Sequence, residues 1–361
     1  MNILFVHSIG KKKFGGGERW LIAVANGLKS RGHRVIVVGR PGSRLLDAAM
    51  KSGLESEGMN IFSDISLYHA FKLLGIIGKQ KIDVVISRDR DIAVAGLAAG
   101  MGGNPLVIVR YGSPLRRSFR KHAFLLGRFA DGVITNTYSI KEEFESRKIT
   151  EKGFVRVIYN GLFMRDDKHK YDFSARFPGK KIILSVGRLT VHKGYMYLID
   201  AVEMLGSKFD DLMFVLLGEG KHHGKLAAYA RRKGVDSLVH FEGYVDNVIP
   251  YLRGCDIFVL PSLYEGMPNA AMEAMAYGKP VILTEVNGAR ELIPDENKGI
   301  LIPAHDAAAI AGTVERLLGD SELCLRMGKE AAGFINNNFT ESAMIDNIES
   351  YIFEKLAEKK L

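Results

Sequence analysis

The chain has 361 residues, of which 47% are hydrophobic, 25% charged and 9% aromatic. This composition is typical of a globular protein and excludes a disordered tail, a collagen-like rod and a disulfide-stabilised scaffold. The net charge of +9 is uneven, because residues 1–165 carry +14 and residues 166–361 carry −5. A strongly basic half is compatible with a nucleic-acid partner, and the sequence motifs test this interpretation.

Short apolar runs alternate with amphipathic stretches along the first half of the chain. The runs are rich in Val and Ile and do not alternate with polar residues, which is typical of strands buried on both faces of a parallel sheet. They are Ile3–His7, Arg34–Val38, Val84–Ser87, Leu106–Val109, Val133–Thr137 and Val155–Tyr159. Glu18–Ser30 has the apolar spacing of a helix, and Gly32 follows it as a stop.

The second half repeats this alternation. Its strand-like runs are Lys181–Val186, Leu212–Leu217, Val239–Phe241, Asp256–Leu260, Val281–Leu283 and Ile300–Ile302. Its helical stretches are Tyr195–Leu205, Lys221–Lys233, Asn269–Tyr277, Ala307–Leu318, Ser321–Asn336 and Glu341–Lys359. The pattern predicts an α/β protein with two doubly wound, Rossmann-like domains.

We expect these domains to span residues 1–165 and 166–340, with a final helix in residues 341–361 that packs back toward the N-terminal domain. The boundary region 162–180 is polar and charged and contains Pro178-Gly179. Open α/β sheets bind ligands beyond the carboxyl ends of their strands. The predicted site is therefore a central cleft that the two domains face.

The two cysteines, Cys255 and Cys324, are too few for a disulfide framework, and no Cys/His cluster suggests zinc. We therefore expect a reducing, cytoplasmic setting and no metal site. The longest apolar stretch, Asp91 to Met101, is shorter than the roughly 18 residues that span a membrane. Any membrane contact is expected to be peripheral.

A glycine-rich loop, Phe14-Gly15-Gly16-Gly17-Glu18-Arg19, follows the first predicted strand. Glycines before a helix let the backbone approach a ligand and direct free amides at an anion. A flexible loop is the alternative, because the segment matches neither the dinucleotide fingerprint nor the P-loop.

Two cations follow the first strand of the second domain. Arg188 and Lys193 lie within Gly187-Arg188-Leu189-Thr190-Val191-His192-Lys193-Gly194, directly before a predicted helix. A guanidinium fork, an ammonium and a helix N-terminus suit a diphosphate, although two solvated surface cations remain the alternative.

Two glutamates eight residues apart form the strongest motif. Glu265 lies in a loop after the predicted strand Asp256–Leu260, and Glu273 lies about one turn into the next helix. A carboxylate can accept two hydrogen bonds from the paired hydroxyls of a ribose. The Ala- and Met-rich surroundings of Glu273 argue against an ordinary solvated helix face.

Together these segments resemble retaining glycosyltransferases of family 4, nucleotide-sugar-dependent enzymes of GT-B architecture. The resemblance covers nearly the whole chain and is concentrated in residues 181–303. The carrying segments are Val186-Gly187-Arg188-Leu189, Lys193-Gly194, Gly218-Glu219-Gly220, the Glu265–Glu273 segment, Gly288-Ala289-Arg290-Glu291 and Gly299–Pro303, with Gly16-Gly17 and Ile158–Gly161 in the first half.

The resemblance implies a role for each matching position. Arg188, Lys193 and Glu265 would be catalytic, and Glu273, Gly218 and Tyr244 would contact the nucleoside. The donor diphosphate and sugar would be bound by Gly16, Gly17, Arg188, Lys193, Glu265, Gly266, Met267, Asn269 and Ala270. Residues 166–340 would form the donor domain and residues 1–165 the acceptor domain.

The implied reaction moves a hexose-type sugar to a glycan or lipid-linked acceptor in cell-surface polysaccharide or lipopolysaccharide synthesis, with retention and without a metal cofactor. The expected donor is a UDP-sugar, with GDP- and ADP-sugars as alternatives. One departure concerns a histidine that many relatives carry after the strand matching Leu106–Val109. Here the segment reads Val109-Arg110-Tyr111-Gly112, and His122 lies in a basic stretch typical of a surface helix.

The basic surplus is then expected on the acceptor side, where the predicted acceptor residues are Arg110, Tyr111, Arg116 and Arg117. A basic acceptor domain fits an anionic acceptor or an anionic inner membrane face. Nucleic acid is not expected, because no reader motif accompanies the charge. The alternatives are an NAD-type oxidoreductase, which Gly218-x-Gly220-x3-Gly224 does not fit in spacing, and a non-catalytic sugar-nucleotide-binding protein.

Overall fold

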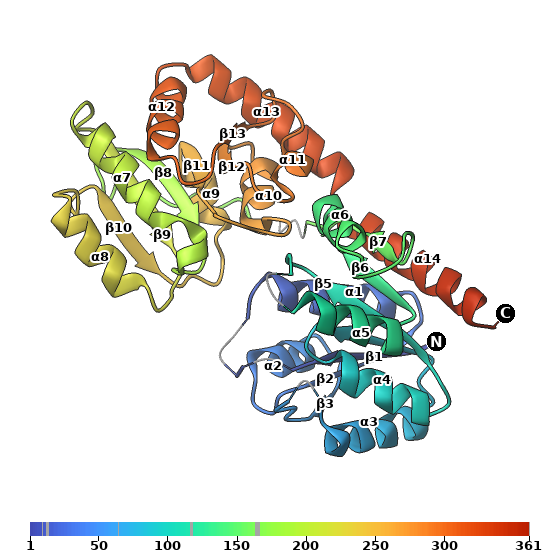
Figure 1. Cartoon of the computed structure of the whole chain (residues 1–361). Helices are drawn as coiled ribbons and strands as arrows, with labels where there is room; N and C mark the ends of the chain where they lie inside the picture. The colour runs from blue at the N-terminus through green and yellow to red at the C-terminus, as the bar shows by residue number, and fades with distance from the viewer. Residues whose placement is uncertain (9, 12–13, 64, 116–117, 163–166, 361) are drawn as a thin grey trace. The chain divides into compact units, whose positions relative to one another are not determined.

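The computed structural model describes residues 1–8, 10–11, 14–63, 65–115, 118–162 and 167–360 (Figure 1). The chain forms two compact units, one of residues 1–161 together with 341–361 and the other of residues 162–340. The break follows Gly161 rather than residue 165, and the final helix belongs to the first unit.

The N-terminal unit contains a seven-stranded parallel sheet in the order β3-β2-β1-β4-β5-β6-β7. Its strands are β1 (Asn2–His7), β2 (Arg34–Gly39), β3 (Glu55–Gly58), β4 (Val84–Arg88), β5 (Leu106–Tyr111), β6 (Gly132–Thr135) and β7 (Val155–Val157). Its helices are α1 (Gly16–Ser30), α2 (Arg44–Lys51), α3 (Leu67–Gln80), α4 (Ile92–Met101), α5 (Phe119–Phe129), α6 (Tyr138–Ser146) and α14 (Glu341–Lys360).

The edge strand β3 was not predicted. Its residues, Glu55-Ser56-Glu57-Gly58, are polar and mostly exposed, so they lack the apolar run that revealed the other strands. The parallel pairing of Ile36 to Gly39 with this segment makes it a strand. A sheet edge has one solvated side, which tolerates such residues.

The C-terminal unit contains a six-stranded parallel sheet in the order β10-β9-β8-β11-β12-β13. Its strands are β8 (Lys181–Val186), β9 (Leu212–Leu217), β10 (Val239–Gly243), β11 (Ile257–Leu260), β12 (Val281–Thr284) and β13 (Ile300–Ile302). Its helices are η1 (Val191–Lys193), α7 (Tyr195–Gly206), α8 (His223–Arg232), α9 (Ile249–Gly254), α10 (Asn269–Ala276), α11 (Ala289–Leu292), α12 (Ala307–Leu318) and α13 (Ser321–Asn338).

Helix α14 packs on the N-terminal unit through two glycines. A Cβ on Gly27 of α1 would overlap Ile345, and one on Gly132 of β6 would overlap the hydroxyl of Tyr351. Both glycines therefore leave room for large side chains of α14, which appears in red along this unit (Figure 1). This close packing explains why the last residues join the first unit.

Both sheets reverse their strand order once, between β1 and β4 in the first unit and between β8 and β11 in the second. The loops that leave two such strands diverge and open a crevice at their carboxyl ends, where α/β proteins bind ligands. The predicted doubly wound, Rossmann-like organisation is thus confirmed for each unit. Within the described parts of the chain, the helices are too short or too polar to cross a membrane.

Candidate functional site

The loops after β8 and β11 meet at the switch point of the C-terminal sheet. The Leu263 amide donates a 2.7 Å hydrogen bond to the carbonyl of His192. Gly194 has φ +68°, and a Cβ there would overlap the Pro261 carbonyl oxygen. Glycine is thus required at position 194 for both its backbone conformation and the close approach of the two loops.

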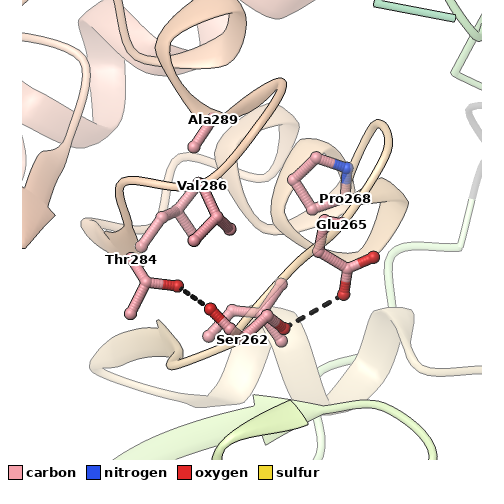
Figure 2. A pocket seen from close by; sticks show the side chains of 8 residues that line it. Ser262, Glu265, Pro268, Thr284, Val286 and Ala289 are labelled. Atoms are coloured by element: carbon pink, nitrogen blue, oxygen red, sulfur yellow. Dashed lines mark hydrogen bonds between the residues drawn. The ribbon is translucent and has the colours of Figure 1, made fainter. Parts of the chain in front are cut away.

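Lys193 and Glu265 form an ion pair across this switch point, joining two residues that the sequence predicted as catalytic. Their side chains are only 13% and 18% exposed. The Ser262 hydroxyl donates to the same Glu265 oxygen over 3.0 Å, and the Thr284 hydroxyl donates to the Ser262 carbonyl (Figure 2). This chain of hydrogen bonds from β12 fixes the carboxylate, and the carboxylate in turn orients the ammonium.

Arg188 lies exposed on the same loop as Lys193. Among the described residues its guanidinium has no ion pair, so its hydrogen-bond donors are available to a ligand. Gly187 precedes it, and a Cβ at that position would come within 3.0 Å of Lys193 Cε and 2.9 Å of the Tyr195 hydroxyl. The absence of a side chain at Gly187 therefore leaves the space that the lysine occupies.

The predicted residues of α10 share one accessible face. Asn269, Ala270 and Glu273 are partly exposed, whereas Ala271, Met272, Ala274 and Met275 are buried. Glu273 lies one turn from the helix start, as the sequence indicated. Gly266 and Met267 are buried, so a ligand meets these two positions through the backbone.

Two of the predicted nucleoside residues, Gly218 and Tyr244, follow two neighbouring strands. The Gly218 amide, after β9, donates a 2.7 Å hydrogen bond to the carbonyl of Gly243, directly before Tyr244. A Cβ on Gly218, whose φ is +133°, would overlap the Gly187 carbonyl oxygen. Gly218 thus has a packing role, and Tyr244 presents a 39% exposed side chain at the strand ends.

A small hollow beside Glu265 and Ser262 is lined also by Pro268, Thr284 and Val286 (Figure 2). Its volume is about 10 Å³, the space of roughly one water molecule. The hollow therefore cannot contain a sugar, and the accessible surface of Lys193, Arg188 and α10 is the binding surface to consider.

In the N-terminal unit, Gly16 and Gly17 form the first positions of α1, where backbone amides lack helical partners. Glu18 is buried, and its carboxylate accepts hydrogen bonds from His7 over 2.9 Å and from the Gly15 amide over 2.6 Å. Burial acts to raise the pKa of Glu18, but the bonds from His7 and Gly15 lower it to about 2. Glu18 thus fixes the shape of the glycine loop and is not available to a ligand.

Arg110 lies beside the glycine loop. Its guanidinium stacks 4.0 Å from the Trp20 ring and bonds the Asn160 side chain over 3.3 Å, and Gly112, where a Cβ would come within 2.8 Å of it, leaves space for it. Burial and the neighbouring Arg88 lower the pKa of Arg110 to about 10, so it stays positive at neutral pH.

Tyr111 points into the core. It is 2% exposed, packs edge-on against Phe144 and bonds His122 Nδ1 over 2.7 Å. Its side chain therefore does not reach an acceptor. His122 is partly exposed on α5, and its ring is bonded to Tyr111. Arg116 and Arg117 lie outside the described residues.

The described residues contain no group of three or more His, Cys, Asp or Glu side chains placed to hold a metal ion. The chemistry that the arrangement supports is anion binding at Arg188 and Lys193, next to hydrogen-bond acceptors for hydroxyl groups at Glu265 and Glu273.

Comparison with known proteins decides the family. A model described as "Glycosyl transferases group 1" matches residues 167–334, and one described as "Glycosyltransferase Family 4" matches residues 14–162. The chain belongs to the family 4 glycosyltransferases. The predicted resemblance and the GT-B fold class are confirmed.

Three relatives show how far the similarity extends along this glycosyltransferase. The lipopolysaccharide core biosynthesis glycosyltransferase LpsE of Rhizobium meliloti is 28% identical, over 92% of this chain and 94% of that protein. The UDP-Gal:alpha-D-GlcNAc-diphosphoundecaprenol alpha-1,3-galactosyltransferase of Escherichia coli is 27% identical, over 81% and 80%. The crystal structure of Anabaena HepE in complex with UDP and glucose has a TM-score of 0.87 and 21% identity, over 98% and 100%.

Sequence reasoning missed three partners of the predicted residues. These are Ser262, which fixes Glu265, His7, which pairs with Glu18, and Trp20, which stacks on Arg110. Ser262 lies between the predicted strand Asp256–Leu260 and Glu265, so its position after a strand was a usable signal. The other two contacts depend on packing between separate elements.

Proposed function

We propose that this glycosyltransferase moves a hexose-type sugar from a UDP-sugar to a glycan or lipid-linked acceptor, with retention of anomeric configuration and without a metal cofactor. The observation that carries this proposal is the Lys193–Glu265 ion pair at the switch point, next to the exposed Arg188. The UDP named with HepE and the UDP-Gal named for the Escherichia coli relative support uracil as the base of the donor nucleotide.

The proposed chemistry separates the sugar from its diphosphate. Negative charge develops on the leaving diphosphate and positive charge on the anomeric carbon. Arg188 and Lys193 stabilise the leaving group, and removal of one such contact costs on the order of 100-fold or more in rate. The acceptor oxygen attacks the face that the diphosphate leaves, and its proton passes to the departing phosphate oxygen.

Glu265 has two roles in this proposal. One of its two carboxylate oxygens, Oε1, accepts hydrogen bonds from Lys193 and Ser262. The other oxygen keeps its capacity to accept hydrogen bonds from sugar hydroxyls. Glu273 and Asn269, on the accessible face of α10, extend the same surface toward the ribose and the phosphates. Tyr244 and the backbone near Gly218 lie at the adjoining strand ends, where the base binds.

We also propose that the enzyme takes part in the synthesis of lipopolysaccharide or another cell-surface polysaccharide. The role that the name of LpsE gives supports this part of the proposal. A cytoplasmic setting with peripheral contact to an anionic inner membrane face also belongs to it, supported by the basic N-terminal half. Sedimentation with anionic vesicles tests this contact. Binding that does not depend on anionic lipid or salt contradicts it.

A thermal-shift experiment with UDP, GDP and ADP tests donor binding. A ligand at 100 times its Kd stabilises the native state by about 2.7 kcal/mol. We expect UDP to raise the melting midpoint of the native protein and of Lys225→Ala, an exposed control on α8. The rise should be much smaller for Lys193→Ala and Arg188→Ala. If none of the three nucleotides shifts the melting midpoint, the donor assignment is wrong.

The stereochemistry and the metal requirement need separate measurements. Proton NMR of the product distinguishes retention from inversion by the anomeric coupling constant. Transfer in the presence of EDTA should equal transfer with added Mg²⁺ or Mn²⁺. An inverted product or an EDTA-sensitive rate would contradict the corresponding part of the proposal.

A further inference from the structure

A polar cavity of about 180 Å³ lies at the carboxyl ends of β1 to β4 in the N-terminal unit. Its lining includes Ser8 after β1, Arg40 after β2, Asn60 and Phe62 after β3, and Arg90 after β4. The cavity has about 18 times the volume of the hollow beside Glu265, and it is large enough for a phosphate or diphosphate group.

The charges around this cavity favour an anion. Arg40 Nε is buried and has no hydrogen-bond partner among the described residues, which is costly for a charged donor. Two acids among the described residues near the cavity already have partners. Asp91 accepts bonds from the amide and hydroxyl of Ser8, and Asp89 pairs with Arg88 at 3.0 Å. Arginines bind phosphate oxygens through paired, parallel hydrogen bonds, so a phosphate supplies what Arg40 lacks.

An exposed apolar surface adjoins the cavity. It comprises Phe62, Ile65, Leu67, Tyr68 and Phe71, each between 58% and 75% exposed, and we call it the β3–α3 patch. Phe62 belongs to both the patch and the cavity wall. The Phe62 and Tyr68 rings flank His69 at centroid distances of 5.7 and 5.2 Å, and Lys72 Nζ lies 4.6 Å from the Tyr68 ring centre. Large apolar groups gathered in this way mark a binding surface.

We propose that the cavity binds the diphosphate of a lipid-linked acceptor and that the β3–α3 patch contacts the first part of its lipid chain. A neutral glycan leaves Arg40 without a partner, and a soluble sugar phosphate leaves the patch in water. A lipid diphosphate satisfies both, because Phe62 joins the two features. The assignment of this ligand as an acceptor rests on the proposed function. It places the anionic end of the acceptor at Arg40 and Arg90, away from the predicted Tyr111.

The test is equilibrium binding by calorimetry with three probes, farnesyl diphosphate, inorganic pyrophosphate and farnesol. The full chain is used, and UDP is present at saturation so that diphosphates do not occupy the donor surface. The variants are Arg40→Ala, Arg90→Ala and the double change Phe62→Ser with Phe71→Ser. Matched controls on α13 of the other unit are Arg326→Ala and Leu325→Ser, which remove an exposed cation and an exposed leucine.

We expect farnesyl diphosphate to bind at least tenfold more tightly than either pyrophosphate or farnesol. Arg40→Ala and Arg90→Ala should weaken the binding of both diphosphates at least tenfold. The Phe62/Phe71 variant should weaken the binding of farnesyl diphosphate alone, and the control variants should leave all three affinities unchanged. If Arg40→Ala does not fold, Arg90→Ala carries the test, because Arg90 is exposed.

Three results overturn the inference. They are unchanged farnesyl diphosphate affinity in the arginine variants, equal weakening by Arg326→Ala, and equal affinity for pyrophosphate and farnesyl diphosphate. The last result identifies a free-phosphate site in place of a lipid-diphosphate site. Loss of UDP binding alone contradicts the proposed function and leaves the cavity assignment standing, so the two failures are distinguishable.

Discussion

Lys193 and Glu265 bond to each other across the switch point of the C-terminal sheet, at the ends of loops that follow β8 and β11. The two residues are 72 positions apart in the chain, and both are largely shielded from water. The lysine is therefore held in place without a ligand, which would reduce the entropy lost in the proposed binding of the donor diphosphate.

This pairing predicts different effects of two substitutions on UDP binding. Lys193→Ala should lower the affinity for UDP at least tenfold, because a cation that pairs with the phosphates is lost. Glu265→Gln should leave UDP affinity unchanged or slightly tighter, since the amide no longer competes for the ammonium. Both variants should lose on the order of 100-fold in sugar transfer. Calorimetry with UDP and a transfer assay measure the two quantities.

Lys225→Ala is the control for the loss of a lysine, and it should match the native protein in both measurements. Equal weakening of UDP by Lys193→Ala and Glu265→Gln would show that the pair acts through the loop structure and not through the phosphate.

Gly194→Ala tests the backbone requirement beside Lys193. The added Cβ would collide with the Pro261 carbonyl and would occupy a φ of +68°, which disfavours alanine. The loops after β8 and β11 must then separate, so UDP affinity should fall at least as far as in Lys193→Ala. Gly224→Ala in α8, where a Cβ meets open space, is the matched control. Native-like UDP binding by Gly194→Ala would contradict the close approach of the loops.

The residue patterns identified the strands buried on both faces, because such strands are continuous apolar runs. They did not identify β3, whose polar residues become a strand only by pairing with β2. At the candidate site, Arg188, Lys193, Glu265 and Glu273 could be predicted because strand ends mark the binding edge of a parallel sheet, and their contact with a ligand stays a prediction. The Lys193–Glu265 bond and the burial of Tyr111 could not, since both depend on side-chain packing between distant segments.

The low pKa of Glu18 predicts an acid-dependent loss of stability. This pKa lies at about 2 in the folded protein against an ordinary 4.5, so the unfolded state binds a proton more readily. Its contribution is then complete above about pH 4.5 and declines as pH falls toward 2. The shift corresponds to at most about 3 kcal/mol at neutral pH.

Glu18→Gln should therefore melt at a lower temperature than the native protein at pH 7, and the difference should shrink as the pH falls below 4.5. Calorimetric melting between pH 3 and pH 7 measures it. Glu57→Gln, an exposed change of the same charge on β3, is the control and should show little difference at any pH. A constant difference across the whole range would exclude the His7–Glu18 interaction as its source.

The contact between Gly27 and Ile345 predicts that Gly27→Ala destabilises the N-terminal unit. The added methyl group would overlap Ile345 on α14, and overpacking of this kind costs about 1–3 kcal/mol. Gly75→Ala is the matched control, because a Cβ there meets open space within α3, and this change should stabilise the protein by about 0.5–1 kcal/mol. Urea unfolding of the full chain measures the free energy of unfolding of both variants.

A double variant tests the contact itself. Gly27→Ala combined with Ile345→Ala should lower the free energy of unfolding by less than the sum of the two single effects, since the shortened side chain leaves room for the methyl group. Simple additivity would show that α14 does not pack on α1 through this pair.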